Sequence, residues 1–260
     1  YSLGHKALAV NLSDLAAMGA EPAWFMLNIA LPKADASWLQ HFSRGMFELA
    51  REHNVQLVGG DTSRGPLTIA IEAHGFVPPG QALWRSGAKA GDRIYVTGTL
   101  GDAALALRHR LGGIRLPERD LAAVAGRMDR PTPRVREGMM LRGLAHSAID
   151  ISDGLLADLG HILEMSSAGA RIHLDKIPVS PVCRAHVAET GWDLVLAYGD
   201  DYELCFTVPE KHVAALEKLR PACGFQHIGM IEAEPGLRIV DENGRLYQPL
   251  QSGHDHFANN

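Results

Sequence analysis

Apolar residues recur along the chain with two spacings, one typical of helices and one typical of strands. They fall about one helical turn apart over residues 6–19 and again over residues 37–52. Short apolar runs bounded by Pro or Gly predict strands at 24–31, 55–58 and 67–77. These five elements form a first unit that ends near residue 80.

A second unit follows a connector at residues 82–91 and again mixes strands with helices. Its predicted strands are 93–97, 148–151, 170–174, 203–208, 227–231 and 237–240. Its predicted helices are 101–111, one within 114–132, 135–144, 155–164 and 211–219. Because regular crossover helices do not separate the strands, the order predicts an α+β fold with mixed, largely antiparallel sheets packed with helices. The predicted domains are residues 1–80 and 81–260.

Composition and charge narrow the class of function. The formal net charge of −5 leaves no basic surplus to neutralise a nucleic acid or an anionic membrane surface. No apolar run approaches the ~20 residues that a membrane-spanning helix needs. Three cysteines without CxxC spacing fit a reducing compartment. We therefore expect a cytoplasmic protein that binds neither nucleic acid nor membrane.

The segment AIDISDG at residues 148–154 is the most informative about chemistry. On a strand, Asp150 and Ser152 would face one side and the two isoleucines the other. An unpaired carboxylate on a buried strand costs on the order of several kcal/mol, so Asp150 needs a partner. A helix N-cap would explain Ser152 or Asp153 alone, whereas metal coordination explains all three polar residues.

Other polar segments allow both a structural and a functional interpretation. Asp14 shares a helix face with Asn11, which is typical of a solvated surface and also compatible with a metal site. The Gly-Gly-Asp-Thr at residues 59–62 is either an ordinary turn after a strand or bare backbone beside a phosphate, with Asp61 as a cation ligand.

Two further segments leave the same choice open. Arg85 begins a basic turn that is either a domain linker or a phosphate contact. The adjacent acids Asp200 and Asp201 are either a solvated turn or a contact to a cationic ligand. No Walker A sequence, protein-kinase signature, H-x-x-x-H pair or G-x-S-x-G elbow is present. Aspartates scattered over glycine-rich turns favour Mg²⁺, which prefers oxygen ligands.

Taken in order, these segments resemble the thiamine-monophosphate kinase family, within a superfamily of ATP-using enzymes related to aminoimidazole ribonucleotide synthetase. The resemblance rests on KALAVNLSDLAAMGA at 6–20, VGGDT at 58–62, SGAK at 86–89, IDISDGL at 149–155, DYEL at 201–204 and DHF at 255–257. It covers nearly the whole chain. It implies the two-domain fold of that superfamily, with ATP and metal sites in an N-terminal domain through which members form homodimers.

The resemblance also implies an activity and its residues. ATP would phosphorylate thiamine monophosphate to thiamine diphosphate by direct in-line transfer, with several Mg²⁺ ions and no side chain acting as acid or base. The implied magnesium ligands are Asp14, Asp61, Asp150 and Asp153, and the implied ATP contacts are Gly60, Asp61, Arg85 and Ser152. Asp201 is implied as a contact to the thiamine moiety. His254 stands where the family tends to place an aromatic residue against the substrate.

The chemistry of this transfer agrees with such a site. The acceptor phosphate is already ionised near neutral pH, so charge repulsion rather than proton removal is the difficulty. Cations held by carboxylates offset that repulsion. Two alternatives stay open: a sibling ATP-dependent synthetase acting on a purine precursor or on selenide, and a non-catalytic binder of a nucleotide or thiamine phosphate.

The beginning of the chain departs from the family pattern. Family members usually start with a further segment that carries metal-binding and substrate-binding residues, and none precedes Tyr1. We therefore expect additional sequence upstream of this residue.

Overall fold

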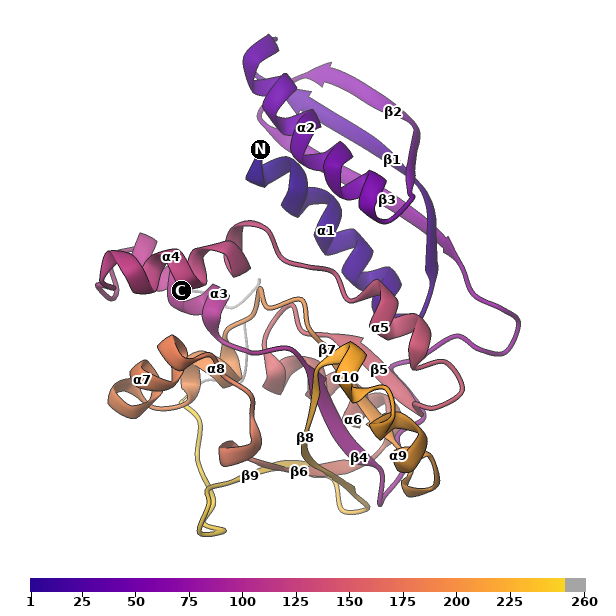
Figure 1. The fold of residues 1–260 in the computed structure, drawn as a ribbon, viewed down its shortest axis with the longest axis vertical. Helices are drawn as coiled ribbons and strands as arrows, with labels where there is room; N and C mark the ends of the chain where they lie inside the picture. Colours follow the sequence, from indigo (N-terminus) through magenta and orange to yellow (C-terminus); the bar gives the residue numbers. More distant parts are fainter. Residues whose placement is uncertain (251–260) are drawn as a thin grey trace.

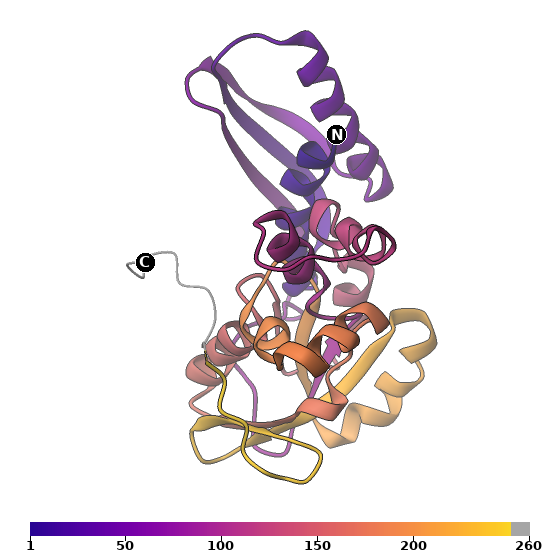
Figure 2. The same ribbon diagram turned by 90° about the vertical axis from the view of Figure 1, so that its left-hand side faces the viewer.

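The computed structural model describes residues 1–250, apart from the side chain of Thr190, and shows two packed parts (Figure 1). The first part contains α1 (Ser2–Ala17), β1 (Glu21–Leu31), α2 (Ala36–Glu52), β2 (Gln56–Arg64) and β3 (Thr68–Phe76). Its three-stranded sheet has the order β2-β1-β3, with β1 parallel to β2 and antiparallel to β3. Both helices cover the same face of this sheet (Figure 2).

The second part contains a six-stranded sheet in the order β5-β7-β4-β8-β6-β9. All neighbouring strands in it are antiparallel except β6 and β9. The strands are β4 (Arg93–Thr97), β5 (Ser147–Asp150), β6 (Gly169–His173), β7 (Leu204–Val208), β8 (Phe225–Glu232) and β9 (Gly236–Val240). The helices are α3 (Asp102–Arg110), α4 (Glu118–Asp129), α5 (Val135–Met140), α6 (Leu155–Ser166), α7 (Pro181–Thr190), α8 (Asp193–Ala197), α9 (Glu210–Glu217) and α10 (Arg220–Cys223). This architecture confirms the α+β class with mixed sheets.

The structure differs from the sequence prediction in the length of one strand and in three additional helices. The Gly-Gly-Asp-Thr at 59–62 does not form a turn, because β2 continues through it and pairs Gly60 with Leu27 and Asp61 with Asn28. Helices α7, α8 and α10 were not predicted. Helices α8 and α10 have only five and four residues, which is too short to show a helical period, and α7 contains few large apolar side chains that would mark one.

One apolar cluster connects the two parts. Leu8 and Leu12 of α1 belong to the same buried cluster as Phe25 of β1 and as Leu204 and Phe206 of β7. Helix α1 therefore lies between the small sheet and the large one (Figure 1). The division into domains 1–80 and 81–260 stays a prediction. None of the helices within residues 1–250 is long and apolar enough to cross a lipid bilayer.

The crossing of α1 and α2 depends on two glycines. A Cβ atom at Gly4 would lie 1.9 Å from the carbonyl oxygen of Phe42, and one at Gly45 would lie 2.1 Å from that of Tyr1. Both atoms that would be struck belong to the backbone, which cannot rotate away as a side chain can. The two helices therefore approach more closely than any larger residue would allow, and this approach fixes how α1 sits on the sheet.

We expect Gly45→Ala to lower the free energy of unfolding by about 1–3 kcal/mol, because the added methyl group must push two helix backbones apart. Urea denaturation followed by circular dichroism measures the change. Gly160→Ala in α6 is the matched control, since its Cβ would meet nothing within 4 Å. That variant should be neutral or more stable by up to about 1 kcal/mol. Equal effects of the two substitutions would contradict the close approach.

Candidate active site

An acidic cluster lies where the C-terminal half of α1 contacts the end of β5. Ser13 of α1 donates a hydrogen bond from Oγ to Oδ2 of Asp150 over 2.7 Å, and both side chains are buried. Asp14 follows on the same helix and is partly open to solvent. The site is thus assembled from residues of both parts of the fold, and the packing of α1 decides its geometry.

The carboxylates of this cluster influence one another. Partial loss of hydration and the negative charge of Asp150 raise the pKa of Asp14 to about 6, while Arg85 opposes the shift. Burial raises the pKa of Asp150, and the nearby charge of Asp153 adds to this; the Ser13 hydroxyl and Arg85 act in the opposite direction. Asp14 and Asp153 therefore both lie within electrostatic reach of Asp150, and Arg85 acts on Asp14 and Asp150 as a nearby cation.

Arg85 reaches the cluster from the connector between the two parts. The neighbouring carbonyl oxygen of Trp84 accepts a hydrogen bond from the Ala148 N–H over 2.9 Å, which holds the connector beside β5. The Arg85 side chain is exposed. An exposed guanidinium next to two carboxylates is free to bind a phosphate with its outer face.

The turn after β5 is held by a residue that the sequence analysis missed. Asp158 of α6 accepts hydrogen bonds from the backbone N–H groups of Ser152, Asp153 and Gly154 at 3.0, 3.0 and 3.1 Å. Its side chain is buried, and burial together with the charges of Asp150 and Asp153 raises its pKa to about 7 against the effect of the N–H donors. The sequence did contain a signal for this role, because Asp158 is an acid among the apolar positions of the helix predicted at 155–164.

A second loop packs against this turn. The Asp200 N–H donates to the Ser152 carbonyl oxygen over 2.8 Å, and the Tyr202 N–H donates to that of Ile151 over 2.9 Å. Asp200 and Tyr202 both have positive φ, at 73° and 51°, which side chains other than glycine rarely adopt. Lys6 of α1 forms an ion pair with Asp200 and lies over the Tyr202 ring, with Nζ 5.8 Å from its centroid. The loop is thereby fixed to both parts of the fold.

The two adjacent acids of this loop point in different directions. Asp201 is buried and accepts hydrogen bonds from the Gly101 N–H at the start of α3, at 3.0 and 3.2 Å to its two oxygens. Burial holds its pKa well above the usual value. Asp200, in contrast, is half-buried and turned toward α1. The predicted contact of Asp201 with a thiamine moiety stays a prediction, and the structure gives this side chain an internal partner instead.

Glu203 anchors the same loop from the other side. Its fully buried carboxylate accepts hydrogen bonds from Arg134 over 2.6 Å and from Arg127 and Thr97 over 2.5 Å each. Two guanidinium groups compensate the buried charge, so this ion pair network holds a fixed geometry.

The remaining predicted residues lie elsewhere. Gly60 and Asp61 are in the exposed strand β2, and no hydrogen bond or ion pair within residues 1–250 joins Asp61 to the acidic cluster. His254 lies outside the described residues. Among those described, no three carboxylate, histidine or cysteine side chains converge closely enough to form a ready metal site. The structure thus brings Asp14, Asp150, Ser152, Asp153 and Arg85 near one another, and Asp61 is not among the charges that act on Asp14, Asp150 or Asp158.

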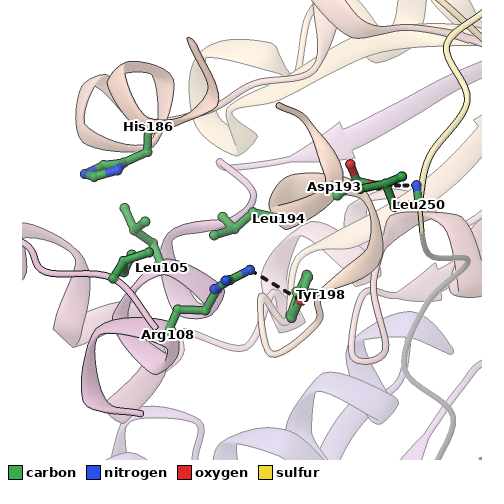
Figure 3. Close-up of a pocket in the computed structure, with 8 residues that line it drawn as sticks. Leu105, Arg108, His186, Asp193, Leu194, Tyr198 and Leu250 are labelled. Atoms are coloured by element: carbon green, nitrogen blue, oxygen red, sulfur yellow. Dashed lines mark hydrogen bonds between the residues drawn. The ribbon is translucent and has the colours of Figure 1, made fainter. Parts of the chain in front are cut away.

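A separate cavity of about 250 Å³ opens between α3, α7 and α8 (Figure 3). Arg108 lies over the ring of Tyr198, 5.7 Å from its centroid, and donates to the Tyr198 hydroxyl over 3.5 Å. Asp193 accepts a hydrogen bond from the Leu250 N–H over 2.6 Å at the edge of the cavity. The cavity contains none of the residues predicted for the site.

The raised pKa of Asp14 predicts a pH-dependent effect of Asp14→Asn on the metal-free protein. Between about pH 4 and pH 6 the folded state binds more protons than the unfolded chain, so stability falls as pH rises through this range. Asparagine does not ionise, so the Asp14→Asn variant does not lose stability in this way. Because solvent screens the partly open carboxyl, we expect a gain of about 2–4 °C in Tm at pH 7.5 that disappears near pH 4.

Differential scanning calorimetry in the presence of a chelator measures this difference. Asp61→Asn in the exposed strand β2 is the control and should leave Tm unchanged at both pH values. A gain that is the same at pH 4 and pH 7.5 would show that the ionisation of Asp14, disfavoured by its burial and by the charge of Asp150, is not its cause.

Comparisons with known proteins agree with this arrangement. Residues 1–77 match the family described as AIR synthase related protein, N-terminal domain, and residues 89–242 match the corresponding C-terminal domain. The thiamine-monophosphate kinase of Escherichia coli (strain K12) is 48% identical over 261 residues, which cover 98% of this chain and 80% of that protein.

Solved structures show the same fold. Thiamine-monophosphate kinase from Stenotrophomonas maltophilia K279a has a TM-score of 0.88 at 44% identity, covering 95% of this chain and 79% of that one. AaThiL complexed with AMPPCP and TMP has a TM-score of 0.81 at 28% identity, covering 98% and 80%. The resemblance seen in the sequence motifs is confirmed. The chain therefore belongs to the thiamine-monophosphate kinase family of AIR synthase related proteins.

Proposed function

We propose that the protein transfers the terminal phosphoryl group of ATP directly to thiamine monophosphate, which gives thiamine diphosphate and ADP. The observation that carries this proposal is the buried Asp150, held by Ser13 beside Asp14, in a chain 48% identical to thiamine-monophosphate kinases. No proton has to be removed from the acceptor, because a phosphate monoester is largely ionised near neutral pH. A site of carboxylates without a histidine or cysteine base suits this reaction.

The donor set fits hard divalent cations. The charge of Asp150 raises the pKa of Asp14, and among residues 1–250 the cation that acts on both carboxyl groups is Arg85. Carboxylate oxygens are the ligands that Mg²⁺ prefers. We propose several Mg²⁺ ions, held by Asp14, Asp61, Asp150 and Asp153. When bound, Mg²⁺ supplies positive charge that offsets the repulsion between two anionic reactants.

The other residues have positioning roles in this proposal. Arg85, exposed on the connector, binds an ATP phosphate through its fork of N–H donors. The Ser152 hydroxyl and the exposed backbone at Gly60 are further proposed ATP contacts. Asp201 and His254 are proposed substrate contacts.

We propose that two copies associate through the N-terminal domain, residues 1–80. The face of the small sheet opposite α1 and α2 is not covered by a helix of the described chain (Figure 2). This face carries exposed Val58 and Phe76, with Trp24 stacked on His74 at 5.4 Å between ring centroids. Within residues 1–250, no strand pairs with the outer edge of β2. An apolar face beside an open edge strand is a surface that proteins usually cover.

A cytoplasmic location is also proposed. Cys183, Cys205 and Cys223 are all buried and free, which fits a reducing compartment.

We expect Asp150→Asn in the complete protein to lower kcat by at least about 10²-fold, the scale on which lost charge stabilisation slows a reaction. The Ser13 hydroxyl can still donate to the asparagine oxygen, so circular dichroism and Tm should show an intact fold. Chromatographic detection of thiamine diphosphate and ADP, formed from ATP, Mg²⁺ and thiamine monophosphate, measures turnover.

Glu232→Gln serves as the control, because Glu232 pairs with Arg171 and Arg238 away from the cluster. It should keep full activity. Formation of ADP without thiamine diphosphate by the unchanged enzyme would refute the proposed acceptor, and a fully active Asp150→Asn would refute the role of this carboxylate.

Val58→Lys should convert a dimer of the complete protein into a monomer, because it places a charge on the apolar outer face of the small sheet, where Val58 is 58% exposed. Size-exclusion chromatography with light scattering at micromolar concentration gives the mass. Leu111→Lys, at a position 77% exposed in the second part, should leave the mass unchanged. Loss of association in both variants, or in neither, would contradict the proposed interface.

A further inference from the structure

Asp158 has an unusual set of partners for a buried acid. One oxygen, Oδ2, accepts the N–H groups of Ser152, Asp153 and Gly154, all within 3.1 Å. Its side chain is 2% exposed. Within residues 1–250 every hydrogen bond given to it comes from the backbone, and no ion pair involves it. A buried carboxyl group without a paired cation is unfavourable unless hydrogen bonds compensate its lost hydration, and here three backbone N–H groups do so.

The three N–H groups belong to the turn that connects β5 to α6. Gly154 has φ of 115°, which opens the chain so that three successive N–H groups can converge on one point. Such a concave arrangement of amides is a common anion-binding geometry, and here the protein's own carboxylate occupies it. The arrangement also places a negative charge in the first turn of α6, where the helix dipole stabilises it.

The turn held by Asp158 fixes two other groups. Asp150 lies at its beginning and Asp153 within it, and both act electrostatically on the cluster that includes Asp14. On the other side, the Ser152 carbonyl oxygen accepts the Asp200 N–H over 2.8 Å. Gly199 packs against it so closely that a Cβ atom there would lie 1.7 Å from this oxygen. A displaced Ser152 would therefore move both acidic loops.

We propose that Asp158 is a positioning residue for the phosphoryl transfer: its carboxylate holds the 152–154 turn so that Asp150 and Asp153 face Asp14 and bind divalent cations together. This inference rests on the proposed function. Asp158 itself touches neither reactant, since its side chain is enclosed by the backbone it organises. Residues that orient metal-binding side chains in this way typically affect metal affinity or activity by about 10–100-fold.

Two substitutions separate this role from simple stabilisation. Asp158→Ala removes the acceptor, whereas Asp158→Asn keeps one carbonyl oxygen that can accept the same N–H groups. We expect the Mg²⁺ concentration for half-maximal activity to rise about 10–100-fold in Asp158→Ala and less than about 10-fold in Asp158→Asn. The KM for thiamine monophosphate should change little at saturating Mg²⁺.

A direct measurement does not depend on turnover. Isothermal titration calorimetry with MgCl₂ and no nucleotide should show a weakened or lost binding isotherm in Asp158→Ala. Amide hydrogen exchange at residues 152–154 should accelerate in the same variant while exchange in β4 stays slow. If the unchanged enzyme makes no thiamine diphosphate but the calorimetric difference persists, the proposed function fails and the positioning role of Asp158 stands.

Asp241→Ala is the matched control. Oδ1 of Asp241 also accepts two backbone N–H groups, from Asn243 and Arg245 at 2.9 and 2.8 Å, in a turn away from the acidic cluster. This variant should bind Mg²⁺ as the unchanged protein does. A lower Tm without a change in Mg²⁺ binding in Asp158→Ala, or in Asp158→Asn should the alanine variant not fold, would overturn the proposal.

Discussion

Asp14 and Asp150 carry charges that repel each other, yet the packing of α1 against β5 holds them in electrostatic contact. The Ser13 hydroxyl, buried next to Asp14 on the helix, reaches Asp150 over 2.7 Å. Leu8 and Leu12 on the same helix are part of the cluster that joins the small sheet to β7. Apolar burial therefore stabilises an arrangement that charge repulsion opposes, and the pKa of Asp14 is raised first by its partial burial and then by the charge of Asp150.

The rest of the site depends on backbone contacts around that helix. The turn after β5, the loop at 199–203 and α1 form a closed chain of interactions: Asp158 holds the turn, the turn accepts the Asp200 N–H, and Lys6 of α1 pairs with Asp200. Glu203 fixes the far end of the loop through two arginines. Each loop is thus held at both ends, which explains how Asp200 and Tyr202 keep positive φ.

The sequence alone predicted the α+β class, the positions of the main strands along the chain and the family. The motifs are short and local, and apolar periodicity shows directly in long elements such as α2 and β1. It did not predict that β2 continues through Gly60 and Asp61, because the pairing with β1 that extends it is a contact between distant residues. The interpretation of Gly-Gly as a turn signal was therefore wrong.

The sequence also could not predict the directions in which the acidic side chains of the site point. Asp200 and Asp201 are adjacent and chemically identical, and only the three-dimensional path of the loop sends one toward α1 and the other to the start of α3. The role of Asp158 in holding the turn after β5 was not predicted for a similar reason. A helix pattern predicts that the residue is buried, but its three N–H partners come from a turn whose shape depends on Gly154.

The acids around the site differ in whether the protein itself supplies their hydrogen-bond partners. In the second part, Asp158, Asp201 and Glu203 all accept hydrogen bonds from groups within the protein, and these contacts fix the loops around the site. Asp14 lacks such a partner among the hydrogen bonds of the described residues, and Asp61 lies exposed on β2. The acids that remain open to a ligand therefore come mainly from the first part, while the second supplies the fixed carboxylate of Asp150. Cation binding between the two parts would then neutralise Asp14 and Asp150 together, so the same ions that assist the transfer would also tighten the contact on which the site depends.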